Sequence, residues 1–145
     1  MHQMERGLPR AAAAEIRRGA TRLARRLRAA RSADALSGAE VSVLGHLYRR
    51  GPSTPTEVAA ADHKQLQSLT RVLAQLERNG LVTRSRDTGD RRQVRLTLTS
   101  AGEAALLADM AERDAWLAAA LGDLTETEIE VLRLAGRLMD RLADM

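Results

Sequence analysis

The chain has 145 residues, 44% hydrophobic and 29% charged, which is the size and balance of one globular domain rather than a disordered protein. It has no cysteine, which excludes disulfides, thiolate zinc sites, cysteine nucleophiles and thiol redox sensing. No apolar run approaches the roughly 18 residues of a membrane span, and residues 1–31 lack a signal-peptide core, so we expect a cytoplasmic protein with no membrane partner. One tyrosine, one tryptophan and no phenylalanine favour packed helices over a β-sandwich.

The formal net charge of +4 is distributed unevenly along the chain. Residues 1–31 contain nine basic and two acidic residues, residues 64–95 eight and three, and residues 96–145 four and ten. Two interpretations stay open for the N-terminal arginines. They contact nucleic acid, or they pair with the acidic C-terminal segment in a dimerisation region, which is the interpretation we favour.

Residues 8–31 have the apolar spacing of a helix, because apolar side chains recur there at steps of three and four. These side chains are Ile16, Ala20, Leu23, Leu27 and Ala30. A second helix opens at a capping box formed by Ser37 and Glu40 and ends at Gly51. Its expected apolar stripe is Val41, Leu44, Leu47 and Tyr48.

A short third helix follows, with Thr54 as its N-cap, Pro55 at its first position and Glu57 completing a second capping box. A fourth helix is predicted from about residue 65 to residue 79, with Gly80 ending it. Its expected apolar face is Leu66, Leu69, Val72, Leu73 and Leu76.

The apolar period then changes from 3.6 to 2, which predicts two strands, residues 81–85 and 93–98, joined by a charged turn. A long helix is expected from Thr99 or Ser100 to about residue 121. A capping box of Thr125 and Glu128 opens the last helix. The apolar stripe of this helix is too wide for one contact, so we expect it to pack on two sides.

Helix, short helix, tight turn, helix and hairpin, in this order, predict a winged helix-turn-helix. The expected fold class is therefore mainly α with a small β-hairpin wing and long terminal helices. We expect a single domain over residues 1–145, with a DNA-binding lobe at about 36–100 flanked by long helices at about 8–31 and 103–145, which the family resemblance given below implies are dimerisation helices. A helix held in this way fits the major groove of DNA, and a basic hairpin reaches the adjacent minor groove.

The side of the fourth helix opposite its leucines carries the candidate base-reading residues. Gln67 and Arg71 are four residues apart and so share one face. Gln suits adenine and Arg suits guanine, both bidentately. A solvated helix face would contain the same residue types, but the adjoining basic hairpin favours DNA. The candidate contacts on this helix are Gln65, Gln67, Ser68, Thr70, Arg71 and Gln75.

The predicted hairpin is rich in arginine and has one carboxylate at its tip. We expect Asp90 to pair with a neighbouring arginine and fix the loop, which leaves the other guanidinium for a narrow, electronegative minor groove. The alternative is a surface ion pair of little energetic value. The candidate wing contacts are Arg84, Arg86, Asp90, Arg91 and Arg92.

No pattern supports catalysis or metal binding. The three histidines are isolated, no pair of them has zinc spacing, and there is neither a Ser-His-Asp arrangement nor a phosphate-binding glycine loop. We therefore expect no enzyme activity, no cofactor and no metal. His46, Tyr48 and Trp116 are candidates for lining a small-molecule pocket, although packing in the core is the favoured interpretation for each.

Several motifs occur together in a specific order and spacing: Leu76–Gly80 followed by Leu81-Val82, then Asp90-Arg91-Arg92, then Leu96–Thr99 with Gly102. With the turn at residues 51–54 and the pair Thr70-Arg71, they make residues 36–103 resemble the MarR family of bacterial winged-helix regulators. The resemblance implies a homodimer with interlocked terminal helices that binds a palindromic operator in double-stranded DNA. It also implies repression of nearby genes, relieved by a small, often anionic aromatic ligand.

Two residues depart from the family pattern, since Lys64 and Leu66 stand where many members carry small or polar residues. The alternative function is a winged-helix protein-interaction module that does not read DNA sequence. An exposed recognition face that carries arginine favours the regulator.

Overall fold

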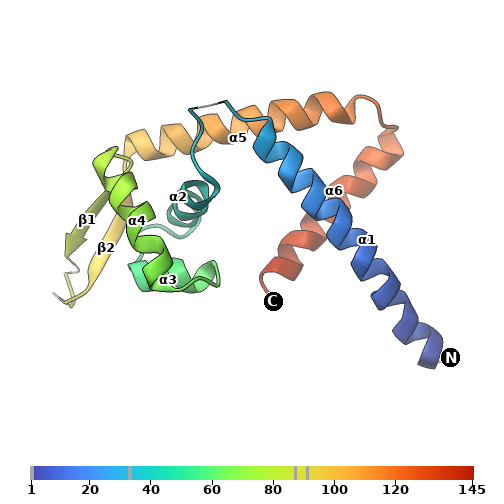
Figure 1. Ribbon diagram of the computed structural model, residues 1–145, viewed down its shortest axis with the longest axis horizontal. Coiled ribbons are helices and arrows are strands. Elements are labelled where there is room, and N and C mark those ends of the chain that lie inside the picture. Colours follow the sequence, from blue (N-terminus) through green and yellow to red (C-terminus); the bar gives the residue numbers. More distant parts are fainter. Residues whose placement is uncertain (1, 33, 87, 91) are drawn as a thin grey trace. The chain divides into compact units, whose positions relative to one another are not determined.

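The computed structural model describes residues 2–32, 34–86, 88–90 and 92–145, with side chains from residue 7 onward. The elements follow the predicted order, as Figure 1 shows: α1 (His2–Ala29), α2 (Gly38–Arg50), α3 (Pro55–Ala61), α4 (Leu66–Arg78), β1 (Val82–Arg86), β2 (Val94–Leu98), α5 (Ser100–Leu121) and α6 (Glu126–Ala143). The predicted fold class, a mainly helical winged helix-turn-helix with long terminal helices, is confirmed. None of the described helices is long and apolar enough to span a membrane.

The chain forms two compact units. The winged unit is Arg31–Ala111, and the helical unit consists of the residues up to Ala30 and from Glu112 onward. The winged unit therefore contains α2, α3, α4, the hairpin and the first part of α5. The helical unit contains α1, the end of α5 and α6.

The winged unit is built around one aliphatic core, to which each of its elements contributes. α4 packs against α2, α3 and β1, and α2 also packs against β2. The buried core residues are Val43, Leu44, Leu47, Val58, Ala59, Leu69, Leu73, Leu76, Val82, Leu96 and Leu106. Leu36 and Val41, on either side of the capping box of α2, both pack against this core, as in a hydrophobic staple.

Side-chain caps fix where the helices begin. The Glu40 backbone N–H donates to Ser37 Oγ at 3.1 Å and the Ser37 N–H to Glu40 Oε1 at 3.0 Å, which is the predicted capping box. The same reciprocal pair forms between Thr125 and Glu128 at α6. At α3 only half of the predicted box is present among the described residues, where the Glu57 N–H donates to Thr54 Oγ1 at 3.1 Å.

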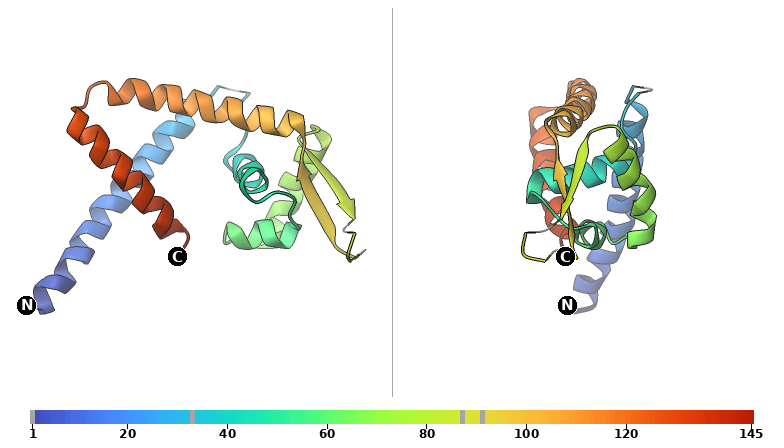
Figure 2. Two further views of the ribbon diagram at one scale, coloured as in Figure 1. Left: turned by 180° about the vertical axis from the view of Figure 1, so that it is seen from behind. Right: turned by 90° about the vertical axis from the view of Figure 1, so that its left-hand side faces the viewer.

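The wing is an antiparallel hairpin, which Figure 2 shows as two arrows side by side. In its register Val82 pairs with Leu98 and Arg86 with Val94. The turn before α3 extends it, because Ser53 exchanges two backbone hydrogen bonds with Leu96, at 3.1 and 2.8 Å. This bridge joins the base of the wing to the start of the helix-turn-helix. The local sequence pattern did not predict it.

Two residues predicted to lie on apolar faces are exposed instead. Leu66 is 46% exposed, because it is the first residue of α4 and the buried leucines of that helix begin at Leu69. Tyr48 is 47% exposed, because its ring lies over a hollow near the end of α2 rather than in the core. For both residues the core interpretation was wrong.

The helical unit leaves much of its apolar surface uncovered within one chain. No residue of α6 is buried, and its broad stripe is exposed at Val131, Leu132, Leu134, Leu138, Met139 and Leu142. Ile16 and Leu23 of α1 are exposed as well. Within the described part of a single chain, α6 therefore does not bury apolar residues on two sides.

Candidate nucleic-acid interface

The recognition helix, α4, separates an apolar side from a polar side. Leu69, Leu73 and Leu76 are buried in the core, which turns Gln67 and Arg71 to solvent. Among the described residues, neither of these two side chains makes a hydrogen bond or ion pair. Both are therefore available to an external partner, and their four-residue spacing places them one turn apart on the same face.

The other candidate residues of α4 are exposed but more constrained. Gln65 is the N-cap through its backbone, and its carbonyl accepts the Ser68 N–H at 3.0 Å. The Thr70 hydroxyl donates to the Leu66 carbonyl at 3.4 Å, and Gln75 Oε1 accepts a hydrogen bond from Arg78 at 2.8 Å. Gln75 would have to give up this bond before it could contact a base.

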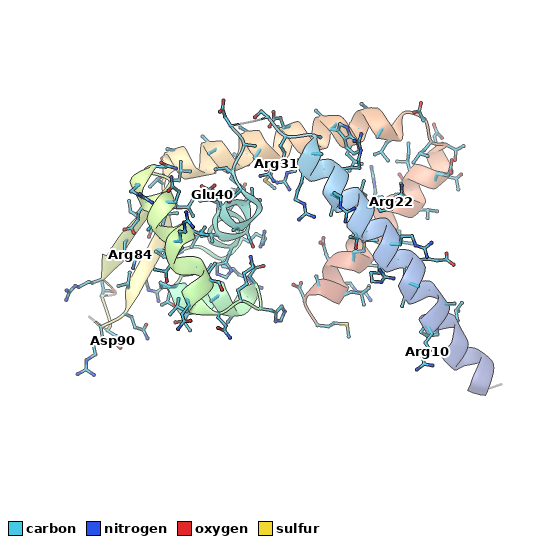
Figure 3. All side chains as sticks on the ribbon, viewed as in Figure 1. Arg10, Arg22, Arg31, Glu40, Arg84 and Asp90 are labelled. Carbon is cyan, nitrogen blue, oxygen red and sulfur yellow. The ribbon has the colours of Figure 1, made fainter. Side chains whose placement is uncertain are left out.

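On the wing, one candidate arginine is paired with the recognition helix. Arg84, labelled in Figure 3, has its Nε 3.2 Å from Glu77 Oε2, so a half-exposed ion pair joins β1 to α4. Arg86 and Arg92 are exposed near the tip of the hairpin. Arg91 lies outside the described residues.

Asp90 organises the tip of the wing through backbone bonds. Its carboxylate accepts the Arg92 N–H at 3.0 Å, and its carbonyl accepts the Gln93 N–H at 3.0 Å. Within the described residues, its partner is thus the backbone amide of an arginine rather than a guanidinium. The loop is fixed by this turn, and the Arg92 side chain extends into solvent.

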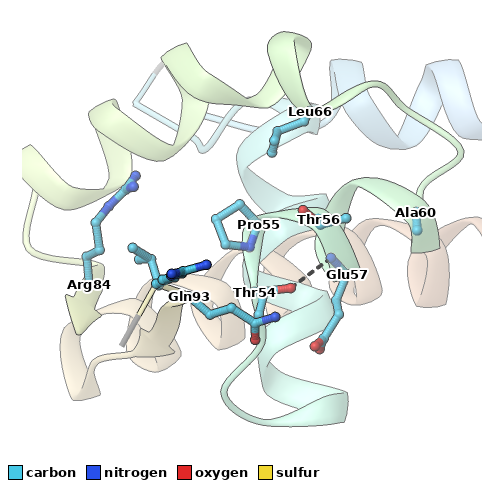
Figure 4. Close-up of a pocket in the computed structure, with 10 residues that line it drawn as sticks. Thr54, Pro55, Thr56, Glu57, Ala60, Leu66, Arg84 and Gln93 are labelled. Atoms are coloured by element: carbon cyan, nitrogen blue, oxygen red, sulfur yellow. Dashed lines mark hydrogen bonds between the residues drawn. The ribbon is translucent and has the colours of Figure 1, made fainter. Parts of the chain in front are cut away.

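A pocket of about 590 Å³ opens between the start of α3, the start of α4 and the wing (Figure 4). Pro55, Leu66 and Val94 give it apolar walls, Arg84 and Arg92 give it positive charge, and Glu57 gives it one negative charge. A small molecule with an apolar ring and an anionic group would match this lining. The sequence alone did not indicate the pocket, because its residues come from three separate segments.

The residues predicted to line a ligand pocket belong to different units. His46 and Tyr48 lie on α2 in the winged unit, and Trp116 lies on α5 in the helical unit. Tyr48 borders a hollow of about 310 Å³ whose described lining contains Glu103 and no cation. Trp116 is half-buried, with the Arg26 guanidinium 5.4 Å from the centre of its ring.

His46 makes a structural hydrogen bond. Its Nε2 is 3.1 Å from Ser53 Oγ, and the Ser53 hydroxyl donates its own proton to the Gly51 carbonyl at 2.9 Å. Nε2 must therefore be the donor to Ser53. Burial lowers the pKa of His46, and the positive charges of Arg49 and Arg50 lower it further. No group of three or more potential metal ligands occurs in the described part of the chain.

The basic face of α1, which includes Arg10 and Arg22 (Figure 3), is exposed. From Arg10 to Arg28, none of its arginines forms an ion pair with an acidic residue of the C-terminal segment within the described part of one chain. Both interpretations of these arginines, contact with DNA and pairing across a dimer, remain predictions.

Comparison with known proteins gives consistent matches. A model of the MarR family matches residues 36–94. An HTH-type transcriptional regulator of Mycobacterium tuberculosis is 33% identical over 132 residues, which cover 91% of this chain and 92% of that protein.

Solved structures agree in fold. A candidate transcriptional regulator from Pseudomonas aeruginosa is 38% identical, with a TM-score of 0.78 over 92% of this chain and 94% of that one. Bordetella bronchiseptica BpsR, whose DNA binding is regulated by 6-hydroxynicotinic acid, is 23% identical. It has a TM-score of 0.67 over 89% of this chain and 98% of its own, which is a likeness of fold.

Proposed function

The chain belongs to the MarR family, and we propose that it is a homodimeric repressor that binds a palindromic operator and is released by a small anionic ligand. Members of this family are transcriptional regulators with a helix-turn-helix DNA-binding fold, not enzymes. The observation that carries the proposal is the exposed pair of Gln67 and Arg71, which faces away from the leucine side of α4.

These two side chains have the chemistry of base readout. A recognition helix enters the major groove and contacts base edges with residues near its N-terminus. Arg71 would donate two hydrogen bonds to a guanine, and Gln67 would exchange two with an adenine. Exposed Ser68 and Thr70 would complete the helix contacts, with Gln65 and Gln75 at either end.

The wing arginines would contribute mainly through charge and groove shape. Arg86 and Arg92 are exposed at the hairpin, and Asp90 holds the loop that presents them. Guanidinium groups are favoured in a narrow minor groove because its potential is strongly negative. Arg91 is proposed to share this role from its position in the sequence. Arg84 would act less directly, because Glu77 already neutralises it.

The apolar stripe of α6 supports a homodimer. Contiguous exposed apolar surface on a soluble chain marks an interface, and a second copy would cover both α6 and the exposed apolar residues of α1. We therefore propose that residues of about 8–31 and 103–145 form the dimerisation helices and that about 36–100 form the DNA-binding lobe. A dimer would present two recognition helices to two half-sites, which requires a palindromic operator.

The arginine-lined pocket supports an anionic effector. The DNA binding of BpsR is regulated by an aromatic acid, and a molecule of that class has the charge to bind near Arg92 and the ring to contact Pro55 and Leu66. The hollow beside Tyr48 fits such a ligand less well, because its described lining contains Glu103 and no cation to offset the repulsion of a carboxylate. Linkage requires the effector and the operator to weaken each other's binding by the same factor.

Selection of genomic fragments by the full-length protein tests the proposal. Bound fragments should share a palindrome, and gel shifts at two salt concentrations should show that the palindrome outcompetes random DNA at both. A protein-interaction module would instead bind all fragments alike, and only at low salt. That outcome would contradict sequence-specific regulation.

A further inference from the structure

Arg31 and Asp109 form a buried ion pair that the proposed DNA contacts do not use. Arg31 Nε lies 3.1 Å from Asp109 Oδ1, and the two side chains are only 8% and 3% exposed. Removing two charges from water costs about as much free energy as their attraction returns. The pair therefore adds little to the free energy of unfolding, and we infer its role from where it lies in the fold.

The pair lies at the two points where the chain enters and leaves the winged unit. This unit begins at Arg31 and ends at Ala111, two residues after Asp109. Arg31 lies two residues after Ala29, the last residue of α1 (Figure 3), and Asp109 lies within α5. Since the unit is one continuous stretch of chain, these are its two covalent connections to the remainder of the protein.

The α5 connection is itself fixed to the winged unit. Gly102, Leu106 and Asp109 are the buried residues of α5, at steps of four and three that place them on one face. Leu106 belongs to the aliphatic core, and Gly102 contacts the Leu81 carbonyl and the Leu98 side chain. Asp109 lies on the same face, close to the end of the winged unit at Ala111. There its carboxylate contacts Arg31, which belongs to the other connection.

We propose that Arg31 and Asp109 are positioning residues that hold the two connections of the winged unit together and thereby fix the separation of the two recognition helices in the dimer. The inference rests on the proposed function, because this separation has meaning only for a dimer on two half-sites. A buried guanidinium stays beside its carboxylate, because separating the two would leave each charge unpaired away from water, whereas apolar side chains of similar size can slide past each other. With the pair intact, the winged unit resists rotation about its connections.

The test compares operators that differ only in half-site spacing. The operator is the one selected by the wild-type protein, and two variants of it carry one inserted or one deleted base pair at the centre. Because a base pair changes both distance and rotation along the helix, we expect the wild-type dimer to lose affinity about tenfold on either variant. The double variant R31M/D109L removes both charges of this pair together. On the two operators with altered spacing, this variant should lose affinity only about threefold or less. Its discrimination against base changes within a half-site should stay at the wild-type level.

Leu106→Ala is the matched control. It removes a buried side chain from the same face of α5 and lowers stability without touching the ion pair. It should keep the tenfold spacing penalty. An equal reduction of the penalty in L106A, or an unchanged penalty in R31M/D109L, would overturn the inference.

A second variant decides the question if R31M/D109L does not fold. Arg31→Lys keeps the charge but loses the planar group that contacts Asp109. Its spacing penalty must be smaller than that of the wild type, and an unchanged penalty overturns the inference. If instead the wild-type protein selects no palindrome, the proposed function fails. If the protein does select a palindrome and the variant keeps the wild-type spacing penalty, only the positioning role of Arg31 and Asp109 fails, and the proposed function stands.

Discussion

Gly102→Ala tests how tightly the start of α5 is fitted against the wing. A Cβ built at Gly102 would lie 2.1 Å from the Leu81 carbonyl oxygen and 2.8 Å from Leu98 Cδ1. An ordinary contact is about 3.5 Å, so the backbone would have to move by about 1.4 Å. The Leu81 carbonyl also accepts the Thr99 N–H at 3.1 Å, and the Gly102 N–H donates to Thr99 Oγ1 at 3.0 Å. A shift of the Gly102 backbone therefore strains both of these hydrogen bonds, which together link the start of α5 through Thr99 to the residue before the wing.

The expected cost follows from three contributions. Overpacking against backbone costs about 3 kcal/mol, the upper part of its usual range. A strained hydrogen bond adds about 1 kcal/mol, and the better helix propensity of alanine returns about 1 kcal/mol. The free energy of unfolding should therefore fall by about 3 kcal/mol, a large share of the stability of a small domain.

Urea denaturation of full-length protein measures this change, with Gly38→Ala as the control. A Cβ at Gly38 would meet nothing within 4 Å, and the residue is likewise near the start of a helix. We expect G38A to unfold at the same or a slightly higher urea concentration than the wild type. If G102A matched G38A to within about 0.5 kcal/mol, the close approach of α5 to Leu81 would be refuted.

Four further outcomes are expected. His63 has a left-handed backbone (φ 52°), so His63→Gly should raise the free energy of unfolding by about 1 kcal/mol, and a loss in urea denaturation would contradict this strain. Because the pKa of His46 is lowered in the folded state, the unfolded chain binds the proton more readily. Stability should therefore fall as the pH drops from 7.5 through about 6.5, the ordinary histidine pKa, to 5. This part of the pH dependence should be absent in His46→Gln, and an unchanged profile would refute the assignment. Arg92→Ala should weaken binding to all DNA sequences about equally and reduce the salt slope by about 1, whereas a loss confined to one base position would contradict a phosphate or groove contact. Removal of residues 125–145 should abolish the dimer in sedimentation, and a soluble truncated chain that still sediments as a dimer would exclude α6 from the interface.

Local signals predicted the elements of the fold well. Ser37 and Thr125 each cap a helix through a box that lies within four consecutive residues, so the pattern is complete in the sequence. Gly80 likewise follows α4 with a φ of +71°, the conformation that glycine favours at a helix end. The change of apolar period after this residue marked the start of the wing.

Contacts between distant segments could not be predicted in the same way. Nothing near Ser53 indicates that it bridges to Leu96, because this pairing depends on how α2 and the wing fold together. Arg31 is one of many arginines in its region, and no local pattern selects it as the partner of Asp109. The one sequence signal for this ion pair is the position of Asp109, an acidic residue three positions after Leu106 and so on the same, buried face of α5.

The candidate DNA-binding residues were predictable because helix geometry alone decides which side chains oppose the leucines. Gln67 and Arg71 are exposed as this geometry requires. Pairing among the candidates was less predictable, because Arg84 contacts Glu77 from a different element. The pocket between α3, α4 and the wing was missed for the same reason, since three separate segments form it.

Base discrimination by the wild-type protein and by Arg71→Ala tests the central claim most directly. The measurement is the affinity of each for the selected operator and for every single-base variant of one half-site. We expect the wild type to discriminate at each contacted position by about 1–3 kcal/mol. Arg71→Ala should lose this discrimination at one position per half-site and keep it at the others. A variant that binds every sequence more weakly by the same factor would contradict base readout by α4.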